Sequence, residues 1–112
     1  MKTPRLNRQL MLEAQQRLSD GSGGFITAWQ PIGTLWAEVI ARTGRETAQS
    51  GAPISAMSYR IKVRGAPFAT PQRPKPEQRF RDGSRIFLIQ AVADEDPDGR
   101  YLTCFAIEET AV

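Results

Sequence analysis

The sequence contains no histidine and only one cysteine, Cys104. The missing histidine removes the commonest general base, the commonest zinc ligand and any serine–histidine pair. A single cysteine excludes an internal disulfide and a multi-cysteine metal site, and its position within an apolar run predicts a buried thiol. We therefore expect no catalytic residue, no metal and no cofactor.

Long apolar runs are also missing. No stretch approaches the roughly 20 apolar residues of a membrane-spanning helix, and the opening MKTPRLNRQL has no apolar segment of a secretory signal. We expect a protein made and kept in a cytoplasm, with no membrane partner. The 112 residues predict one domain, residues 1–112, and the net charge of +3 permits a polyanionic partner without requiring one.

Short β-like runs are abundant instead, most clearly between residues 79 and 109. Two apolar runs, 86–93 and 101–107, are rich in Ile, Val, Phe and Tyr, which suit a pleated surface. The segment between them, 94–99 (DEDPDG), consists of turn-forming residues, and Asp-Gly at 82–83 indicates another turn. This pattern predicts an antiparallel hairpin preceded by a tight turn.

The first forty residues predict another hairpin. Residues 6–18 alternate between apolar and polar, which favours a half-buried strand over the competing helix. The glycine-rich run 19–24 predicts a hairpin tip, because a phosphate-binding loop would carry a Gly-Lys-Ser/Thr ending. Residues 25–29 are strand-like, residues 30–33 predict a break, and residues 34–40 predict a resumed strand.

The pattern fades between residues 41 and 56. We expect a long loop at 43–57, with a possible short helical turn at 45–50 that ends at Gly51. Loops of this length in a small domain are usually functional or disordered. A binding or gating role and a plain surface loop both remain open.

Residues 57–64 alternate cleanly, with Met57, Tyr59, Ile61 and Val63 expected inward and Arg60, Lys62 and Arg64 outward. The cations could line a solvated or interfacial face, or contact phosphates. The proline-rich stretch 65–78 predicts an extended connector. Cations dominate residues 57–85 and acids dominate from residue 94 onward, which suits head-to-tail association of copies.

These segments predict a mainly β fold. About six short strands with turns between them favour a small antiparallel β-barrel or sandwich, with one long loop and the proline-rich connector. Trp36 lies in a run that is apolar on both faces, and we expect it to meet a neighbouring subunit.

The order and spacing of four segments resemble the head–tail joining proteins (head closure or stopper proteins) of long-tailed phages and of phage-derived gene transfer agents. The segments are LNRQLMLEAQQRLSDGSGGFITAWQPIGTLWAEV (6–39), TGRE (43–46), YRIKVRG (59–65) and DGSRIFLIQAVADEDPDGRYLTCFAIEE (82–109). The proline-rich insert at 67–76 departs from the resemblance, because such proteins more often carry a shorter polar connection there.

The resemblance implies a β-barrel that assembles as a homo-oligomeric ring in a virion or gene transfer agent particle, from protein made in the bacterial cytoplasm. The ring would lie between a portal or portal-bound adaptor and a tail terminator or tail tube protein, closing the channel on packaged double-stranded DNA. The loop would point into this channel, with Arg42, Gly44, Arg45, Glu46 and Gly51. Subunit or neighbour contacts would come from Trp36, Arg60, Lys62, Arg64, Arg73, Lys75, Asp94 and Asp96.

Other functions remain open at this point. One is a tail terminator or tail-completion ring protein of the same particle. Another is a free-standing single-stranded nucleic-acid-binding barrel, with Phe25, Trp29 and Trp36 as stacking platforms. An enzyme is the weakest alternative, since it would depend on carboxylate pairs, Glu38 with Glu46 or Asp94 with Asp96.

Overall fold

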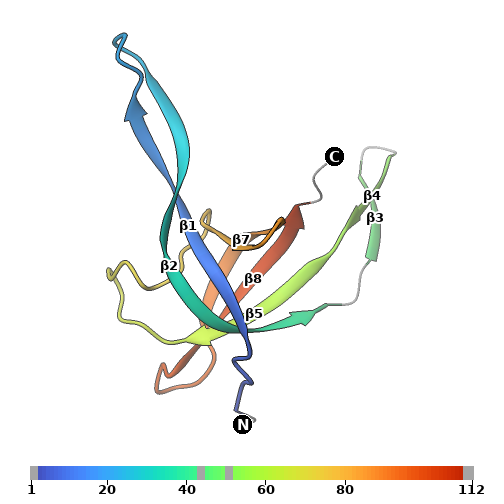
Figure 1. Cartoon of the computed structure of the whole chain (residues 1–112). Coiled ribbons are helices and arrows are strands. Elements are labelled where there is room, and N and C mark those ends of the chain that lie inside the picture. Colours follow the sequence, from blue (N-terminus) through green and yellow to red (C-terminus); the bar gives the residue numbers. More distant parts are fainter. Residues whose placement is uncertain (1–2, 43–44, 50–51, 110–112) are drawn as a thin grey trace.

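A computed structural model describes residues 3–42, 45–49 and 52–109 of the chain, without the side chains of residues 43–56. Within the described residues the secondary structure consists of strands and turns (Figure 1). The strands are β1 (Arg8–Ser19), β2 (Phe25–Ala41), β3 (Arg45–Gln49), β4 (Ala52–Ala56), β5 (Ser58–Arg64), β6 (Arg79–Asp82), β7 (Arg85–Asp94) and β8 (Tyr101–Glu109).

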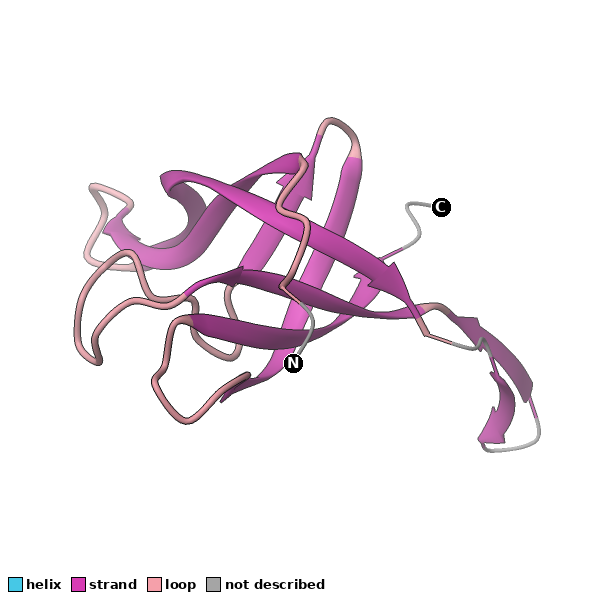
Figure 2. Cartoon of the chain, turned by 90° about the horizontal axis from the view of Figure 1, so that it is seen from below, coloured by secondary structure: helices cyan, strands magenta, loops and turns pink. Residues whose placement is uncertain are grey.

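Six strands close into an antiparallel barrel with the order β1-β2-β5-β8-β7-β6. β3 and β4 pair only with each other and form a separate two-stranded sheet, which projects away from the barrel (Figures 1 and 2). The predicted mainly β fold is confirmed, and its architecture is the barrel rather than the sandwich.

The core follows from the two-residue alternation of strands. In β5, Tyr59, Ile61 and Val63 are buried, while Arg60 and Arg64 are exposed, as the sequence predicts. Met57 was predicted to face inward, but it lies just before the first residue of β5 and is exposed. Each fully buried large apolar side chain contributes about 1.5–3 kcal/mol. The other core residues are Leu10, Leu12, Ala37, Phe80, Phe87, Ile89, Leu102, Cys104 and Ala106.

The single thiol is part of this core. Cys104 is fully buried, and burial raises the pKa of its thiol to about 12. A thiol with such a pKa stays protonated and unreactive at neutral pH. The predicted structural role of Cys104 is thus confirmed.

The predicted break at residues 30–33 is wrong, because β2 runs without interruption through them. The pairing with β1 shifts there: Leu12 faces Gly33 while Glu13 faces Pro31, so Ile32 is an extra residue in β2. This is a β-bulge, which bends a strand without ending it. Pro31 is tolerated because β2 pairs with β5 only over residues 37–41.

The predicted long loop at 43–57 is a hairpin over most of its length. The short helical turn at 45–50 is wrong, because residues 45–49 form β3 and pair with β4 in the register Arg45 to Ala56. Only two residues separate the strands, a length typical of β-hairpins. Gly51, the predicted end of this helical turn, lies outside the described residues.

The connector at 65–78 also differs from the extended form predicted for it. It contains several tight turns, and Ala69 and Glu77 have positive φ angles of 66° and 74°. The hydroxyl and the amide of Thr70 both donate to the Pro67 carbonyl. These local hydrogen bonds shorten the segment into a folded loop.

The predicted tip of the first hairpin is confirmed. Gly21 and Gly23 have positive φ angles of 81° and 84°, which glycine adopts at low cost. The Asp20 carboxylate accepts hydrogen bonds from the amides of Ser22 and Gly24 at 2.8 and 3.0 Å. Beyond Glu13, β1 pairs only with β2, so residues 14–30 form a projecting arm (Figure 1).

Gly65 has the closest backbone neighbour among the glycines that the structure describes. Its amide donates to the Arg100 carbonyl at 2.7 Å, and a Cβ added to it would lie 1.9 Å from the Gly99 carbonyl oxygen. We predict that Gly65→Ala lowers the free energy of unfolding by about 1–3 kcal/mol, as overpacking does. Urea denaturation measures the change.

Gly33→Ala is the matched control, because a Cβ at Gly33 would meet no atom within 4 Å. We expect this control to leave the stability within about 0.5 kcal/mol of the wild type or to raise it slightly. Equal effects of the two substitutions would contradict the steric argument.

Candidate functional site

The base of the β3–β4 hairpin is the first feature of the candidate site. The Arg42 amide donates to the Ser58 carbonyl at 2.9 Å, and the Glu108 amide donates to the Met57 carbonyl at 3.0 Å. These two bonds tie the chain entering β3 to β5, and the chain leaving β4 to β8. Beyond them the hairpin extends clear of the barrel (Figure 1).

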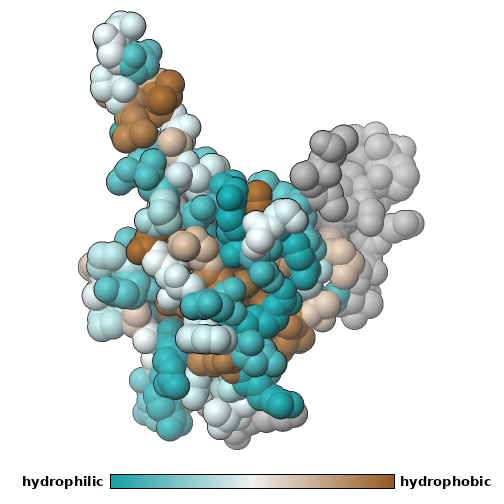
Figure 3. Space-filling model, in the orientation of Figure 1, coloured by the Kyte–Doolittle hydropathy of each residue, from teal (hydrophilic) through white to brown (hydrophobic). Residues whose placement is uncertain are grey.

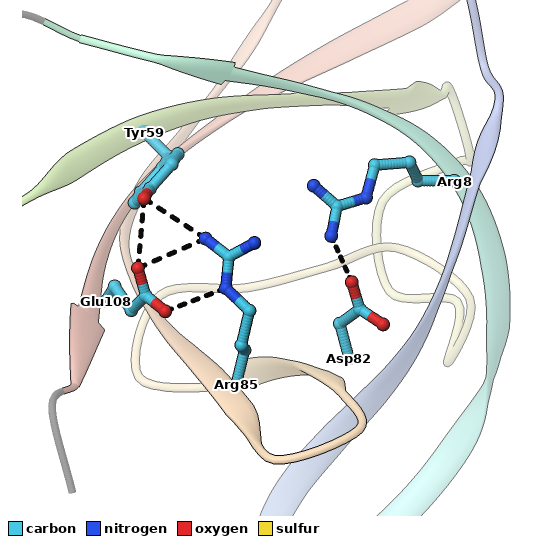
Figure 4. A network of polar contacts seen from close by, with 5 residues as sticks. All are labelled: Arg8, Tyr59, Asp82, Arg85 and Glu108. Atoms are coloured by element: carbon cyan, nitrogen blue, oxygen red, sulfur yellow. Dashed lines mark hydrogen bonds and ion pairs between the residues drawn. The ribbon is translucent and has the colours of Figure 1, made fainter.

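A layer of polar side chains closes the barrel beneath this hairpin. Five barrel strands each place a polar residue at the inward-facing position nearest the hairpin, following the alternation of the core. Figure 4 shows them together: Arg8, Tyr59, Asp82, Arg85 and Glu108. The buried residues next to them on the same faces are apolar, so this layer separates the core from water.

Glu108 is the centre of this layer. Its carboxylate accepts a hydrogen bond from Arg85 Nε at 2.8 Å and another from the Tyr59 hydroxyl at 2.9 Å. Arg85 Nη2 also donates to the Tyr59 oxygen at 3.1 Å, and the Arg85 guanidinium lies 4.9 Å from the centre of the Phe87 ring. Arg8 and Asp82 form a second ion pair beside this group (Figure 4).

These contacts shift the pKa values of Glu108 and Tyr59 in opposite directions. The hydrogen bond from Arg85 holds the pKa of Glu108 below its ordinary value, despite partial desolvation. Burial raises the pKa of Tyr59, and the hydrogen bond to Glu108 raises it further. The carboxylate is therefore charged and the phenol neutral at neutral pH, which is the state in which this hydrogen-bond network is complete.

Cations cover the outer surface at the base of the hairpin. The Arg42 guanidinium lies 5.7 Å from the centre of the Phe105 ring. Phe105 is the cross-strand partner of Arg60, so the two arginines flank one aromatic ring. Among the side chains that the structure describes, neither arginine has a carboxylate within 4.0 Å. The sequence predicted Arg42 in the channel-facing loop and Arg60 among the subunit contacts, and the fold brings them together.

Other predicted site residues form ion pairs or hydrogen bonds within their own subunit. Lys62 pairs with Glu95 at 3.0 Å, and Arg73 pairs with Asp94 at 3.7 Å. Asp96 is buried, and its carboxylate accepts hydrogen bonds from the amide and the side chain of Arg100. These side chains stabilise the turn before β8 and the connector, and their role in subunit contacts stays a prediction.

The remaining predicted residues lie apart from this cluster. Trp36 is 55% exposed and lines, with Leu6 and Arg64, a shallow hollow of about 320 Å³. Lys75 is exposed in the connector. Arg45 and Glu46 are the first residues of β3, with side chains outside the description. Gly44 and Gly51 lie outside the described residues.

No group of three or more His, Cys, Asp or Glu side chains that could hold a metal ion occurs in the described part of the chain. In the same part, no helix is long and apolar enough to span a membrane.

Comparison with known proteins decides the family. The profile of the family described as phage head completion protein matches residues 1–109. The chain belongs to the phage head completion protein family. A head completion protein is a structural component of a phage-type particle, and its place is in that particle.

Two solved structures resemble this head completion protein. A chain in the structure of the virion of a native gene transfer agent particle is 49% identical, with a TM-score of 0.83, and the match covers 98% of this chain and 100% of that chain. Protein SF1141 from Shigella flexneri 2a is 19% identical, with a TM-score of 0.71 and full coverage of both chains, and shares the fold. A search of the curated proteins found no match.

Sequence reasoning missed the polar layer of this head completion protein. A signal for two of its members was present, because Arg85 continues the alternation of Phe87 and Ile89, while Glu108 continues that of Cys104 and Ala106. Charged residues at the ends of strands are usually solvated, so this alternation alone did not indicate an inward direction. The pairing of β5, β7 and β8 was needed to bring the residues together.

The polar layer predicts a pH dependence. Because its folded-state pKa is lowered, Glu108 contributes stability that is present above its ordinary pKa of 4.5 and is lost as the pH falls through the lower value. We expect Glu108→Gln to reduce the free energy of unfolding by about 1 kcal/mol at pH 7, a value limited by partial exposure of the pair. The difference from the wild type should shrink toward pH 3.

The neighbouring Glu109→Gln is the control, because Glu109 is exposed. Denaturant titrations at pH 3, 5 and 7 measure all three proteins. A constant difference between wild type and Glu108→Gln over this range would contradict the ionic contribution.

Proposed function

We propose that this head completion protein forms a homo-oligomeric ring between the tail and the portal, or an adaptor bound to the portal. The ring closes the channel that holds packaged double-stranded DNA and provides the surface on which the tail terminator or tail tube docks. The 49% identity to a chain of a gene transfer agent virion supports a particle of the phage or gene transfer agent type.

The projecting β3–β4 hairpin is the observation that carries this proposal. A six-stranded barrel filled with side chains has no bore for DNA, so a channel must lie between subunits. An element that closes such a channel has to extend beyond the barrel that carries it. The hairpin does so, and among the described strands β3 and β4 pair with each other and not with a strand of the barrel.

The positive charges at the base of the hairpin support its proposed role in closing a DNA channel. Arg42 and Arg60 flank Phe105, and no described carboxylate within 4.0 Å neutralises them. Phosphate groups attract such side chains over the range set by salt screening. A small number of cations favours retention of DNA near the closure without binding it so strongly that ejection stops.

Two of the three aromatic residues expected to stack on single-stranded nucleic acid have an arginine of the same subunit over their rings. The Arg79 guanidinium lies 4.1 Å from the centre of the Trp29 ring, and Arg17 lies over Phe25 at 4.3 Å. Single-stranded binding needs ring faces that are open and aligned along one groove. A tail-completion ring protein has the same geometry as a closure protein, so its position in the particle distinguishes the two.

Removing the hairpin tests the closing role. We predict that replacing residues 45–56 with a short Gly-Ser linker leaves the barrel folded, because the hairpin is not paired with it. Particles that carry this variant should incorporate the protein at wild-type levels but lose packaged DNA. Density-gradient separation of full and empty heads gives the DNA content, and immunoblotting gives the protein content.

A wild-type fraction of full heads, with the variant incorporated, would contradict closure by the hairpin. Absence of the wild-type chain from the head–tail junction in images of the particle would contradict the proposed function as a whole.

Neutralising the base of the hairpin tests the role of charge. We predict that Arg42→Gln combined with Arg60→Gln reduces DNA retention severalfold without reducing incorporation, because these groups attract phosphate and form no ion pair with a carboxylate that the structure describes. The release of DNA from heads at increasing salt measures retention. Arg5→Gln, which changes an exposed cation in the segment before β1 that is assigned to no contact, is the control and should behave as the wild type.

A further inference from the structure

The tip of the arm combines exposed apolar side chains with a cation. Leu18 faces Ile26 across the two strands, and they are 37% and 53% exposed. On the opposite face of the arm, because side chains alternate along a strand, Phe25 is 61% exposed, with the Arg17 guanidinium 4.3 Å from its ring centre. Arg17 has no carboxylate partner among the described side chains, and apolar side chains grouped at the end of a projecting hairpin indicate a contact surface.

A hollow lined by apolar and acidic side chains lies at the other end of the arm. It encloses about 640 Å³ between the base of the arm, the end of the connector and β7. Trp29, Pro76 and Leu88 form apolar parts of its wall, and Glu77 and Glu109 add two carboxylates. Neither carboxylate has a cation within 4.0 Å among the side chains that the structure describes.

The arm of the same subunit leads away from this hollow. Trp29 and Gln15 pair at the base of the arm and line the hollow, whereas the tip lies at the far end of the hairpin (Figures 1 and 3). The tip can therefore reach such a hollow only on another copy. An apolar surface with a cation then meets an apolar surface with two acids, which is the complementarity that favours specific association.

We propose that the arm tip of one copy occupies this hollow on the next copy, with Phe25 against Trp29 and Leu88, and with Arg17 beside Glu77 and Glu109. The contact joins two different surfaces, so it repeats head to tail and closes a ring when the rotation between copies allows it. This inference rests on the proposed ring and identifies the residues that hold its subunits together.

Site-directed cross-linking between two differently labelled copies tests the contact. Thr27→Cys, on the same face of the arm as Phe25 and Arg17, and Gln90→Cys are placed on separate copies, which are produced together and cross-linked with a short bismaleimide in assembled particles. Gln90 is exposed and lines the hollow. Cys104 stays in place because it is buried. The expected result is a dimer that contains one copy of each label.

Ser84→Cys in place of Gln90→Cys is the control, because Ser84 is exposed in the turn between β6 and β7. We expect at least tenfold less dimer with this control. Equal yields from the two pairs, or no dimer from either pair, would overturn the arm contact while leaving the proposed ring intact. A chain missing from the particles would instead count against the proposed function.

A charge reversal supplies an independent readout. Arg17→Glu should reduce incorporation into particles about tenfold, and Glu77→Arg with Glu109→Arg in the same chain should restore it. Circular dichroism confirms that each variant folds, which is expected because the described contacts of these three side chains include no ion pair. Loss without restoration would count against the pairing of these charges.

Discussion

Closure of the barrel depends on a short seam between β1 and β6, in which residues 11–13 pair with residues 79–81. Leu12 and Phe80 meet inside the core, while outside it Arg79 Nε lies 2.7 Å from Glu13 Oε1. Both members of this ion pair are buried, and Arg81 Nε also lies 3.6 Å from Glu13 Oε1, so removing Glu13 would leave the buried charge of Arg79 uncompensated. Since the seam involves so few residues, the rest of β1 continues with β2 as an arm. The same feature that closes the barrel thus leaves an element free to contact another subunit.

The second element that leaves the barrel depends on Glu108. Its amide holds the chain that leaves β4, and its carboxylate holds Arg85 and Tyr59 over the core. One residue therefore links the position of the β3–β4 hairpin to the closure of the barrel end. A hairpin that closes a channel must resist pressure from DNA at its base while its strands stay free. Two backbone hydrogen bonds above a packed polar layer provide such a base.

Local sequence patterns were sufficient for most strands and insufficient for the surfaces. The alternation in β5, the β7–β8 hairpin and the glycine-rich tip at 20–24 follow from residue type alone, because each is determined by neighbours in the chain. The β3–β4 hairpin lacks apolar alternation, since it has no core to face, and it was predicted as a loop. Pro31 suggested the end of a strand, although its place on the unpaired edge of β2 makes it harmless. The Arg42–Phe105–Arg60 group depends on pairing between β2, β5 and β8, which no local pattern contains.

Which charged residues are paired within one subunit could not be predicted from the sequence and follows from the fold. Cations and acids are separated along the chain, which suggested attraction between copies, but the fold pairs many of them within one subunit. Lys62 with Glu95 and Arg73 with Asp94 are examples. Once these pairs are formed, the charges available to partners are those that the fold leaves unmatched. Arg42 and Arg60 lie at the base of the hairpin, and Arg17 lies on the arm, which projects in another direction (Figure 1). Among the cations without a described carboxylate partner, Arg42 and Arg60 thus form one group, and Arg17 lies apart from it.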